Sequence, residues 1–174
     1  NCGLSLAPVP AARRPEIYGY LTPVTGLPAE ELPTQTMQAY LDAVGAAVLP
    51  LNVGMLVGGG TVRAAAAGFS PEPLDSGALH AVHRLIEQSL SGGALGVSLG
   101  LGYAPEIFYT TQQLIDALAP LRESGVPVTV HMRQEGAGVV EALEEMMTAA
   151  RALRTPVHIS HLKSIGKAYW GRYM

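Results

Sequence analysis

The sequence is poor in cysteine and in charged side chains. Its single cysteine, Cys2, excludes a disulfide within the 174-residue chain. Charged residues make up only 14% of the sequence, and 11 Lys and Arg against 14 Asp and Glu leave a net charge of −3. A nucleic-acid-binding surface needs an excess of basic residues, which is missing here. We therefore expect no nucleic-acid partner.

Long apolar runs are missing as well. A membrane-spanning helix needs about 20 consecutive apolar residues, and the longest alanine-rich stretch, 64–68, is far shorter. Asn1-Cys2-Gly3 opens the chain without the basic and hydrophobic regions of a signal peptide. We therefore expect a cytoplasmic protein that has no membrane partner. The chain also starts without a methionine and stops at Tyr173-Met174, which predicts a segment of a longer protein.

Two phosphate-binding motifs are absent. No Gly-x-Gly-x-x-Gly lies between an expected strand and an expected helix, and no Gly-x4-Gly-Lys-Ser/Thr occurs. The run Gly58-Gly59-Gly60 has neither spacing. These absences disfavour a dinucleotide-binding fold and phosphate-loop chemistry.

Apolar residues, in contrast, are plentiful. They make up 48% of the sequence, which is enough to build a sizeable core. The 20 glycines and 13 prolines are spread along the chain and do not gather in one linker. We therefore expect residues 1–174 to lie in one domain, with no internal boundary.

The apolar pattern predicts alternating helices and strands after a turn-rich first third. A helix should begin at Thr34 or Thr36, and a buried strand should occupy 51–57 and end at the three glycines. The prolines that mark turns are Pro8, Pro10, Pro15, Pro23, Pro28 and Pro33. Further helices are expected over 76–91, 111–124 and 138–153, and strands over 94–99, 126–131 and 156–161.

This strand–helix rhythm, with a period of about 30 residues, is typical of βαβ units and a parallel sheet. In 126–131 the valines share one face, while Thr129 and His131 share the other. The apolar face suits packing against helices, and the polar face suits a barrel interior. An open doubly wound sheet has the same rhythm, but this sequence lacks the glycine motif of its dinucleotide-binding form. The sequence therefore predicts an α/β fold, part of a TIM-type (β/α)8 barrel with about four or five of the eight strands.

Three potential metal ligands follow from this arrangement. His131 and His161 close two expected strands one βα repeat apart, so their imidazoles should project from neighbouring strand ends at the same rim. Cys2 becomes a third ligand if a strand ends just before it. Imidazole and thiolate are ligands that suit Zn²⁺.

Each of these residues also has a structural interpretation. A histidine at a strand end is often only a hydrogen-bonded polar residue, and a lone cysteine is often a small buried hydrophobe. His80 and His83 lie one turn apart on an expected helix, where we expect them on or near its solvated face. We interpret His158 as structural, because strand alternation places it opposite His161.

Four ordered motifs resemble the N-acyl-D-amino-acid deacylases (D-aminoacylases) of the amidohydrolase superfamily. The motifs are Asn1-Cys2-Gly3-Leu4-Ser5-Leu6-Ala7-Pro8, Gly96-Val97-Ser98-Leu99-Gly100-Leu101-Gly102-Tyr103-Ala104-Pro105, Val130-His131-Met132-Arg133-Gln134-Glu135-Gly136 and Ile159-Ser160-His161-Leu162-Lys163. They extend over essentially the whole chain. The resemblance implies a zinc-dependent barrel on a longer chain, of which these residues form the middle. It also implies hydrolysis of a small N-acyl-D-amino acid to a carboxylate and a free D-amino acid.

The resemblance assigns roles to five residues. Cys2, His131 and His161 match metal ligands, Lys163 matches a lysine that binds the α-carboxylate of the substrate, and Tyr103 matches a tyrosine of the same pocket. The matching family also has a His-x-His pair and a general-base aspartate, which we expect outside these 174 residues, so no catalytic residue is expected within them. The segment alone is therefore expected to be inactive.

Some positions depart from the family pattern or receive no role. We expect Gly-His-Gly where this chain has Gly59, and Asn-Trp-Gly where it has Tyr169. Arg133 receives no firm role, and holding a loop is an equal alternative.

Two other functions stay open: another amidohydrolase that opens cyclic amides, of the dihydroorotase or hydantoinase kind, and an inactive barrel segment that only binds partners. The acyl group, the side chain, the number of metals and the oligomeric state are not predicted.

Overall fold

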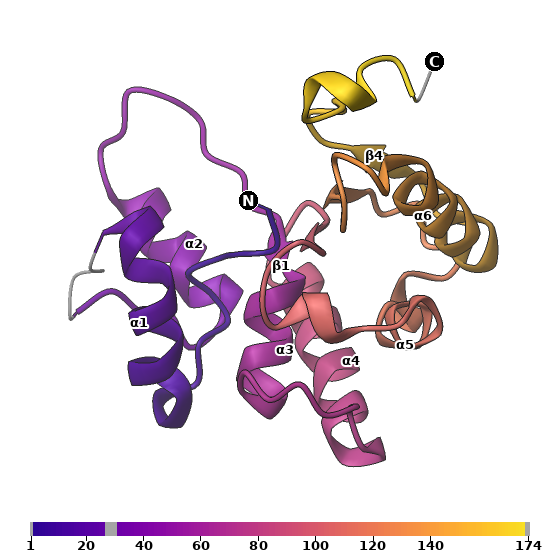
Figure 1. The fold of residues 1–174 in the computed structure, drawn as a ribbon. Helices are drawn as coiled ribbons and strands as arrows, with labels where there is room; N and C mark the ends of the chain where they lie inside the picture. The colour runs from indigo at the N-terminus through magenta and orange to yellow at the C-terminus, as the bar shows by residue number, and fades with distance from the viewer. Residues whose placement is uncertain (1, 27–30, 173–174) are drawn as a thin grey trace.

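The computed structural model describes residues 2–26 and 31–172, so Asn1 of the first motif and Pro28 of the turn prolines lie outside the described residues. The chain forms an α/β fold (Figure 1). The strands are β1 (Val57–Gly58), β2 (Val97–Gly100), β3 (Val128–His131) and β4 (Val157–Ile159). The α-helices are α1 (Arg14–Thr25), α2 (Met37–Ala46), α3 (Gly59–Ala67), α4 (Ser76–Ser91), α5 (Thr111–Ala117) and α6 (Val139–Leu153). Short 3-10 helices are η1 (Ala11–Arg13), η2 (Glu106–Phe108), η3 (Ala119–Leu121) and η4 (Lys167–Tyr169).

The four strands form one parallel sheet in the order β1-β2-β3-β4. Each strand pairs with its predecessor in the chain, and helices α3 to α6 follow one another around the sheet (Figure 1). A sequential order is typical of barrels, whereas a doubly wound sheet reverses its order at a switch point. The prediction of an α/β fold that forms part of a barrel, with about four or five strands, is confirmed, and the described sheet has four.

Two predicted helices are confirmed, the one over 76–91 and the one that begins after Thr36. Asp75 accepts a 2.7 Å hydrogen bond from the N–H of Ala78 and caps α4, which then ends before Gly92. Thr36 accepts from the N–H of Ala39 and begins α2. A side-chain oxygen at the N-cap satisfies a backbone donor that has no partner inside the helix. Thr36 was one of the two predicted caps of α2, whereas the cap Asp75 was not predicted.

The predicted helix over 111–124 is too long. Thr110 caps α5, which begins at Thr111 as predicted but ends at Ala117, and Pro120 lies in the following turn of η3. Proline has no N–H to donate to the carbonyl of Asp116, four residues earlier. The Nε2 atom of His83 lies 2.7 Å from that carbonyl oxygen. His83 therefore contacts a helix end and is half-buried rather than fully solvated.

The predicted strand over 51–57 is wrong for most of its length. Only Val57 and Gly58 are in β1, and Leu51 and Val53 are exposed. Pairing with the next strand starts late, at the hydrogen bond from Leu95 N–H to the Met55 carbonyl. The apolar run predicted burial, but within the described part of the chain no neighbouring element covers its first half.

Helices α1 and α3 are not predicted by the pattern. In α1, Pro15 lies in the first turn, where a missing N–H costs nothing, and Ile17 and Leu21 are buried in a small separate cluster with Val9 and Ala64. Gly59 and Gly60, which we interpreted as the end of a strand, instead begin α3. Proline and glycine were thus interpreted as turn signals where they serve as helix starts.

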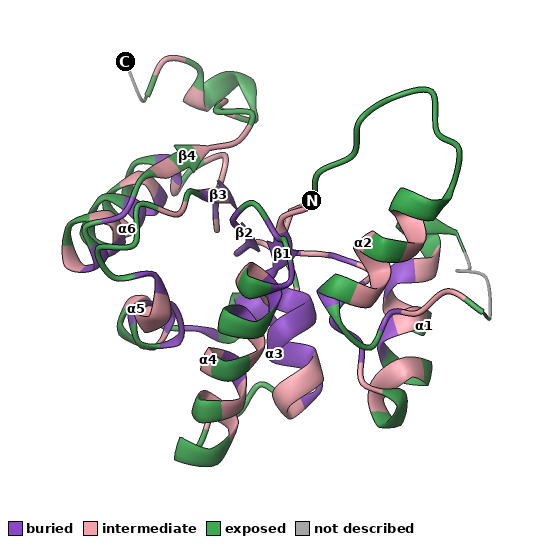
Figure 2. Ribbon diagram, turned by 180° about the vertical axis from the view of Figure 1, so that it is seen from behind, coloured by how far each residue is buried: buried purple, intermediate pink, exposed green. Residues whose placement is uncertain are grey.

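The core lies between the sheet and the helices. Val128 and Val130 are fully buried, while Thr129 and His131 are half-buried, so the predicted alternation of β3 is confirmed. Figure 2 shows the buried residues gathered in β1, β2, β3 and α3. Within the part of the chain that the structure describes, no helix is long and apolar enough to span a bilayer.

Candidate functional site

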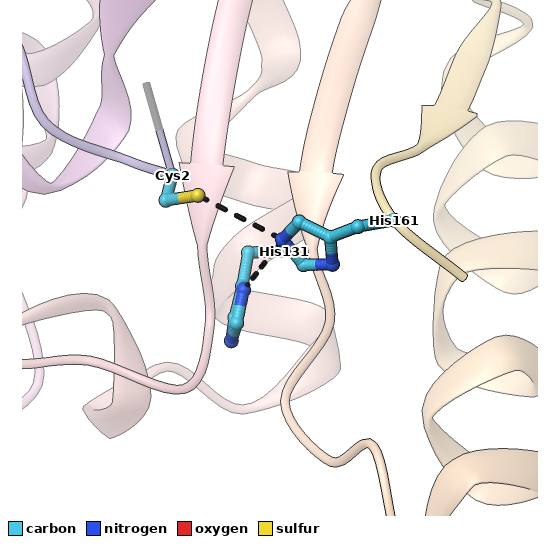
Figure 3. A group of neighbouring side chains, drawn as sticks. All are labelled: Cys2, His131 and His161. Atoms are coloured by element: carbon cyan, nitrogen blue, oxygen red, sulfur yellow. Dashed lines mark hydrogen bonds between the residues drawn. The ribbon is translucent and has the colours of Figure 1, made fainter. Parts of the chain in front are cut away.

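The carboxyl edge of the sheet brings three side chains together (Figure 3). His131 Nδ1 lies 2.9 Å from His161 Nε2, and Cys2 Sγ lies 3.8 Å from the same Nε2 atom. One donor atom from each residue lies within 4.8 Å of the other two. Among the described residues, this is the group of three or more histidine, cysteine or acidic side chains with the spacing of a metal site.

The two histidines reach the site from adjacent strands. His131 is the last residue of β3, as predicted. β4 ends at Ile159, two residues earlier than expected for His161, and Ser160 N–H still donates to the Val130 carbonyl. His161 then takes a left-handed conformation with φ of 40°. Its ring direction is therefore set by a turn and not by strand alternation.

The loop that carries Cys2 lies against the end of β2. Gly3 has a φ of 80°, its N–H donates to Ser98 Oγ, and its carbonyl accepts from Gly60 N–H. A Cβ atom at Gly100 would overlap the carbonyl oxygen of Cys2. The glycines of the first two motifs therefore allow the Cys2 loop to approach the sheet closely.

Tyr103 and Lys163 lie beside this group. The centroid of the Tyr103 ring is 4.6 Å from that of His131, and its side chain is partly exposed. Lys163 Nζ lies 3.1 Å from His161 Nδ1. The structure thus brings all five residues singled out in the sequence to one edge of the sheet.

A carboxylate that the sequence interpretation missed lies among the side chains of Lys163, His161 and His131. Glu135 Oε1 lies 2.6 Å from Lys163 Nζ, 2.9 Å from His161 Nδ1 and 3.8 Å from His131 Nδ1. Its side chain is only 9% exposed. Glu135 is part of the third motif, so its position in that motif was the available signal.

The surroundings of His131 favour its neutral form. Burial lowers its pKa, the carboxylate of Glu135 partly opposes that effect, and the charges of His161 and Lys163 lower the pKa further. A neutral imidazole has a free lone pair on one nitrogen. His131 is therefore able to donate a lone pair to a cation.

Arg133 points away from this site. Its guanidinium pairs with Glu145 and donates to the carbonyls of Ile107 and Tyr109, each at 2.8 Å. It holds the loop after β2, which is the alternative that the sequence left open.

His80 of α4 and His158 of β4 do not join the group. His80 Nδ1 contacts the carbonyl of Ser76 in its own helix, and His158 is exposed. This agrees with the structural interpretation of both residues.

A second missed carboxyl group is Glu106, the first residue of η2. It is buried, and its Oε2 accepts a 2.8 Å hydrogen bond from Gly100 N–H. Burial raises its pKa to about 8, although the N–H groups of Gly100 and Gly60 and the charges of Arg63 and Arg133 oppose the shift. A glutamate in a short loop gives no sequence signal for burial.

The two departures from the family pattern lie in different surroundings. A Cβ atom at Gly59 would overlap Glu106 Oε1, so the side chain of Glu106 uses the room beside this glycine. Tyr169 lies in η4, where the guanidinium carbon of Arg172 is 4.9 Å from its ring centroid.

A parallel βα sheet with a thiol and two imidazoles at its carboxyl edge has the fold of the amidohydrolases, the class to which solved D-aminoacylases belong as a subset. No protein-family model matches the sequence. The resemblance to N-acyl-D-amino-acid deacylases is nevertheless confirmed by individual relatives.

The sequence is 35% identical over 172 residues to a D-aminoacylase of Alcaligenes xylosoxydans xylosoxydans, a match that covers 99% of this chain and 34% of that protein. A D-aminoacylase structure with a binuclear metal centre superposes with a TM-score of 0.81 and 34% identity, over 99% of this chain and 35% of the other. The N-acyl-D-glutamate deacylase of Bordetella bronchiseptica, solved with zinc and a phosphonate inhibitor, superposes with a TM-score of 0.85 and 29% identity, with the same coverage. The chain thus spans about a third of the length of these relatives.

Proposed function

We propose that residues 1–174 form the central part of a single catalytic barrel domain in a zinc-dependent N-acyl-D-amino-acid deacylase. The observation that carries this proposal is the group of one thiol and two imidazoles at the carboxyl edge of the sheet. Similarity to D-aminoacylases over 99% of the chain supports it. The small-molecule substrate and the reaction belong to the complete protein, and its cytoplasmic location stays a prediction.

The donor set fits a zinc ion. Tetrahedral zinc with bonds of about 2.0–2.1 Å to nitrogen and about 2.3 Å to sulfur needs donor atoms about 3.3–3.6 Å apart. Two separations, 2.9 Å between the imidazole nitrogens and 3.8 Å between Cys2 Sγ and His161 Nε2, lie on either side of that range, and all three donor atoms lie within 4.8 Å of one another. Cys2 Sγ, His131 Nδ1 and His161 Nε2 would be the ligand atoms. The lowered pKa of His131 favours the neutral form that a ligand requires.

Amide hydrolysis needs an activated water, because amides are poor electrophiles. When bound, zinc lowers the pKa of its water to about 7 and polarises a carbonyl oxygen. The described residues contribute the ligand set and one wall of the pocket. We expect the general base that moves the proton, an aspartate, to lie outside residues 1–174, so no residue of this segment is assigned that role.

Lys163 would bind the α-carboxylate of the substrate. Its ammonium lies beside His161 and is partly exposed, so it can meet an anion next to the metal ligands. Tyr103 would form the wall beside His131. Holding the carboxylate at one point and the amide carbonyl at another fixes which face of the α-carbon meets the water, and this favours one enantiomer.

The relatives described above are deacylases of N-acyl-D-amino acids, which favours this reaction over hydrolysis of a cyclic amide. The test uses the complete, zinc-loaded protein with N-acetyl-D-amino acids, their L-enantiomers, and a hydantoin and a dihydroorotate as controls. We expect release of free D-amino acid and at least tenfold slower turnover of the L-enantiomers and both cyclic amides. Faster opening of a cyclic amide, or no hydrolysis of any of these amides, would overturn the proposal.

A further inference from the structure

One carboxylate oxygen connects two parts of the site that have different tasks. Glu135 Oε1, His161 Nδ1 and Lys163 Nζ lie at mutual separations of 2.6, 2.9 and 3.1 Å. His161 belongs to the group of potential metal ligands, whereas Lys163 is the candidate anchor for a substrate carboxylate. No other acidic side chain among the described residues makes an ion-pair contact with either of them.

Glu135 is the fixed member of this triangle. Its side chain is 9% exposed, while those of His161 and Lys163 are 40% and 43% exposed. A buried carboxylate is expensive to leave without a partner, so it should retain nearby positive charge or N–H groups. The loop of Glu135 is also attached to the segment after Lys163, because Ile165 N–H donates to the Glu135 carbonyl.

The two nitrogens of His161 face different groups. Nε2 faces His131 and Cys2, and Nδ1 faces Glu135. If Nε2 donates its lone pair to a metal ion, the neutral ring carries its hydrogen on Nδ1, beside the carboxylate. A carboxylate behind a ligating histidine fixes the orientation of the ring and raises its basicity.

We propose that Glu135 is a positioning residue that holds the metal ligand His161 and the substrate anchor Lys163 at one oxygen atom. This inference rests on the proposed function for the tasks of the two partners. The metal site and the carboxylate-binding site are then aligned by the same side chain. A change at Glu135 therefore affects both, whereas a change at Lys163 affects only the substrate.

Two variants separate the two contacts. Glu135→Ala removes both contacts. Glu135→Gln keeps a neutral oxygen that accepts from His161 Nδ1–H but loses the charge that attracts Lys163. Glu144→Gln is the matched control, because Glu144 is an exposed carboxylate on α6.

The experiment measures zinc affinity of the complete protein by competition with a chelator, and KM at saturating zinc. We expect Glu135→Ala to bind zinc 10–100-fold more weakly and to raise KM for N-acetyl-D-amino acids about tenfold or more. Glu135→Gln should raise KM similarly but keep zinc affinity within about threefold. In a Lys163→Met background, Glu135→Gln should raise KM no further, since the charge pair is already broken.

One further readout reports on the ligand set independently of the reaction. Cobalt substituted for zinc should retain its thiolate absorption band in Glu135→Gln, which reports an intact ligand set. If the wild-type protein binds zinc and hydrolyses substrate, but both Glu135 variants match Glu144→Gln in zinc affinity and KM, the role of Glu135 is refuted. If the wild-type protein does neither, it is the proposed function that fails.

Discussion

Glu106 Oε2 accepts a hydrogen bond of 2.8 Å from the backbone N–H of Gly100, the residue of β2 that lies against the Cys2 loop. The carboxyl group is completely buried, and its second oxygen has no hydrogen-bond partner among the described residues. A buried acid thus lies directly behind the candidate metal site. This arrangement has consequences for stability that can be measured.

The buried carboxyl of Glu106 should make stability fall with rising pH. Its pKa is raised from 4.5 to about 8 in the folded protein. Below pH 4.5 both states hold the proton; above it the unfolded state releases the proton first, so the free energy of unfolding falls until about pH 8 and then stays level. Glu106→Gln imitates the protonated acid. It should stabilise the protein at pH 8.5 by on the order of a few kcal/mol relative to wild type, and have little effect at pH 4.5.

Denaturant unfolding of the complete protein at these two pH values measures the difference. Glu144→Gln serves as the exposed control and should show no such pH-dependent gain. Equal stability of Glu106→Gln and wild type at pH 8.5 would show that Glu106 is not buried as a proton-holding acid.

Position 59 and Glu106 should be coupled in space. The family pattern leads us to expect a histidine where this chain has Gly59, but a Cβ atom there would overlap Glu106 Oε1. Gly59→His alone should destabilise the protein by about 1–3 kcal/mol through overpacking. In a Glu106→Gly background the loss should be smaller by about 1 kcal/mol or more, because the room is then free. A double-mutant cycle of unfolding free energies measures this coupling.

Gly19→His is the control for that cycle, because nothing lies within 4 Å of the position of its Cβ atom. Its effect should not depend on residue 106. Additive effects of Gly59→His and Glu106→Gly would contradict the packing described here.

Lys163→Met should impair substrate binding without removing the metal. Methionine retains most of the length of lysine but removes the charge that would pair with the substrate carboxylate. Breaking such a partly buried pair from one side costs about 2–5 kcal/mol, so kcat/KM for N-acetyl-D-amino acids should fall at least tenfold. Lys167→Met in η4 is the exposed control and should retain normal kinetics. Loss of zinc from Lys163→Met would instead assign Lys163 a structural role.

Residues 1–174 expressed alone should be inactive and should associate. β1 and β4 lie at the edges of the sheet and pair on one side only among the described residues. Unpaired strand edges are templates for association, and a barrel closes only when its first and last strands meet. Val48, Leu51 and Trp170 are also largely exposed. A monodisperse, cooperatively melting segment that hydrolyses N-acetyl-D-amino acids would contradict this prediction.

The fold could be predicted where residues act locally. The predicted helix over 76–91 matches α4, and the valines of β3 alternate with polar residues as predicted, because helix periodicity and strand faces depend on neighbours in sequence. The strand predicted over 51–56 was wrong, because burial depends on which other elements cover a segment. The local apolar pattern carries no information about those elements. Helix α3 was not predicted, because its glycines were interpreted as turn signals. They are needed for close contact with Gly3 and Glu106, which are not neighbours in sequence.

The candidate site could also be predicted only in part. His131 and His161 were predictable from the strand period, and Cys2, Lys163 and Tyr103 from the resemblance. Glu135 lies in the third motif, but its contact with His161 joins residues distant in sequence, so the motif alone gave it no role. Glu106 had no signal, because its burial depends on how its loop folds against β2.

The most direct test of the central proposal is the zinc content and activity of the complete protein, with His161→Ala compared with His80→Ala. His80 is the matched control, because it is exposed on α4 and lies outside the candidate site. We predict zinc in stoichiometric amount with the chain, activity that is lost on chelation and restored by zinc, and near-complete loss of zinc and activity in His161→Ala but not in His80→Ala. Full activity in a metal-free sample would contradict the proposal.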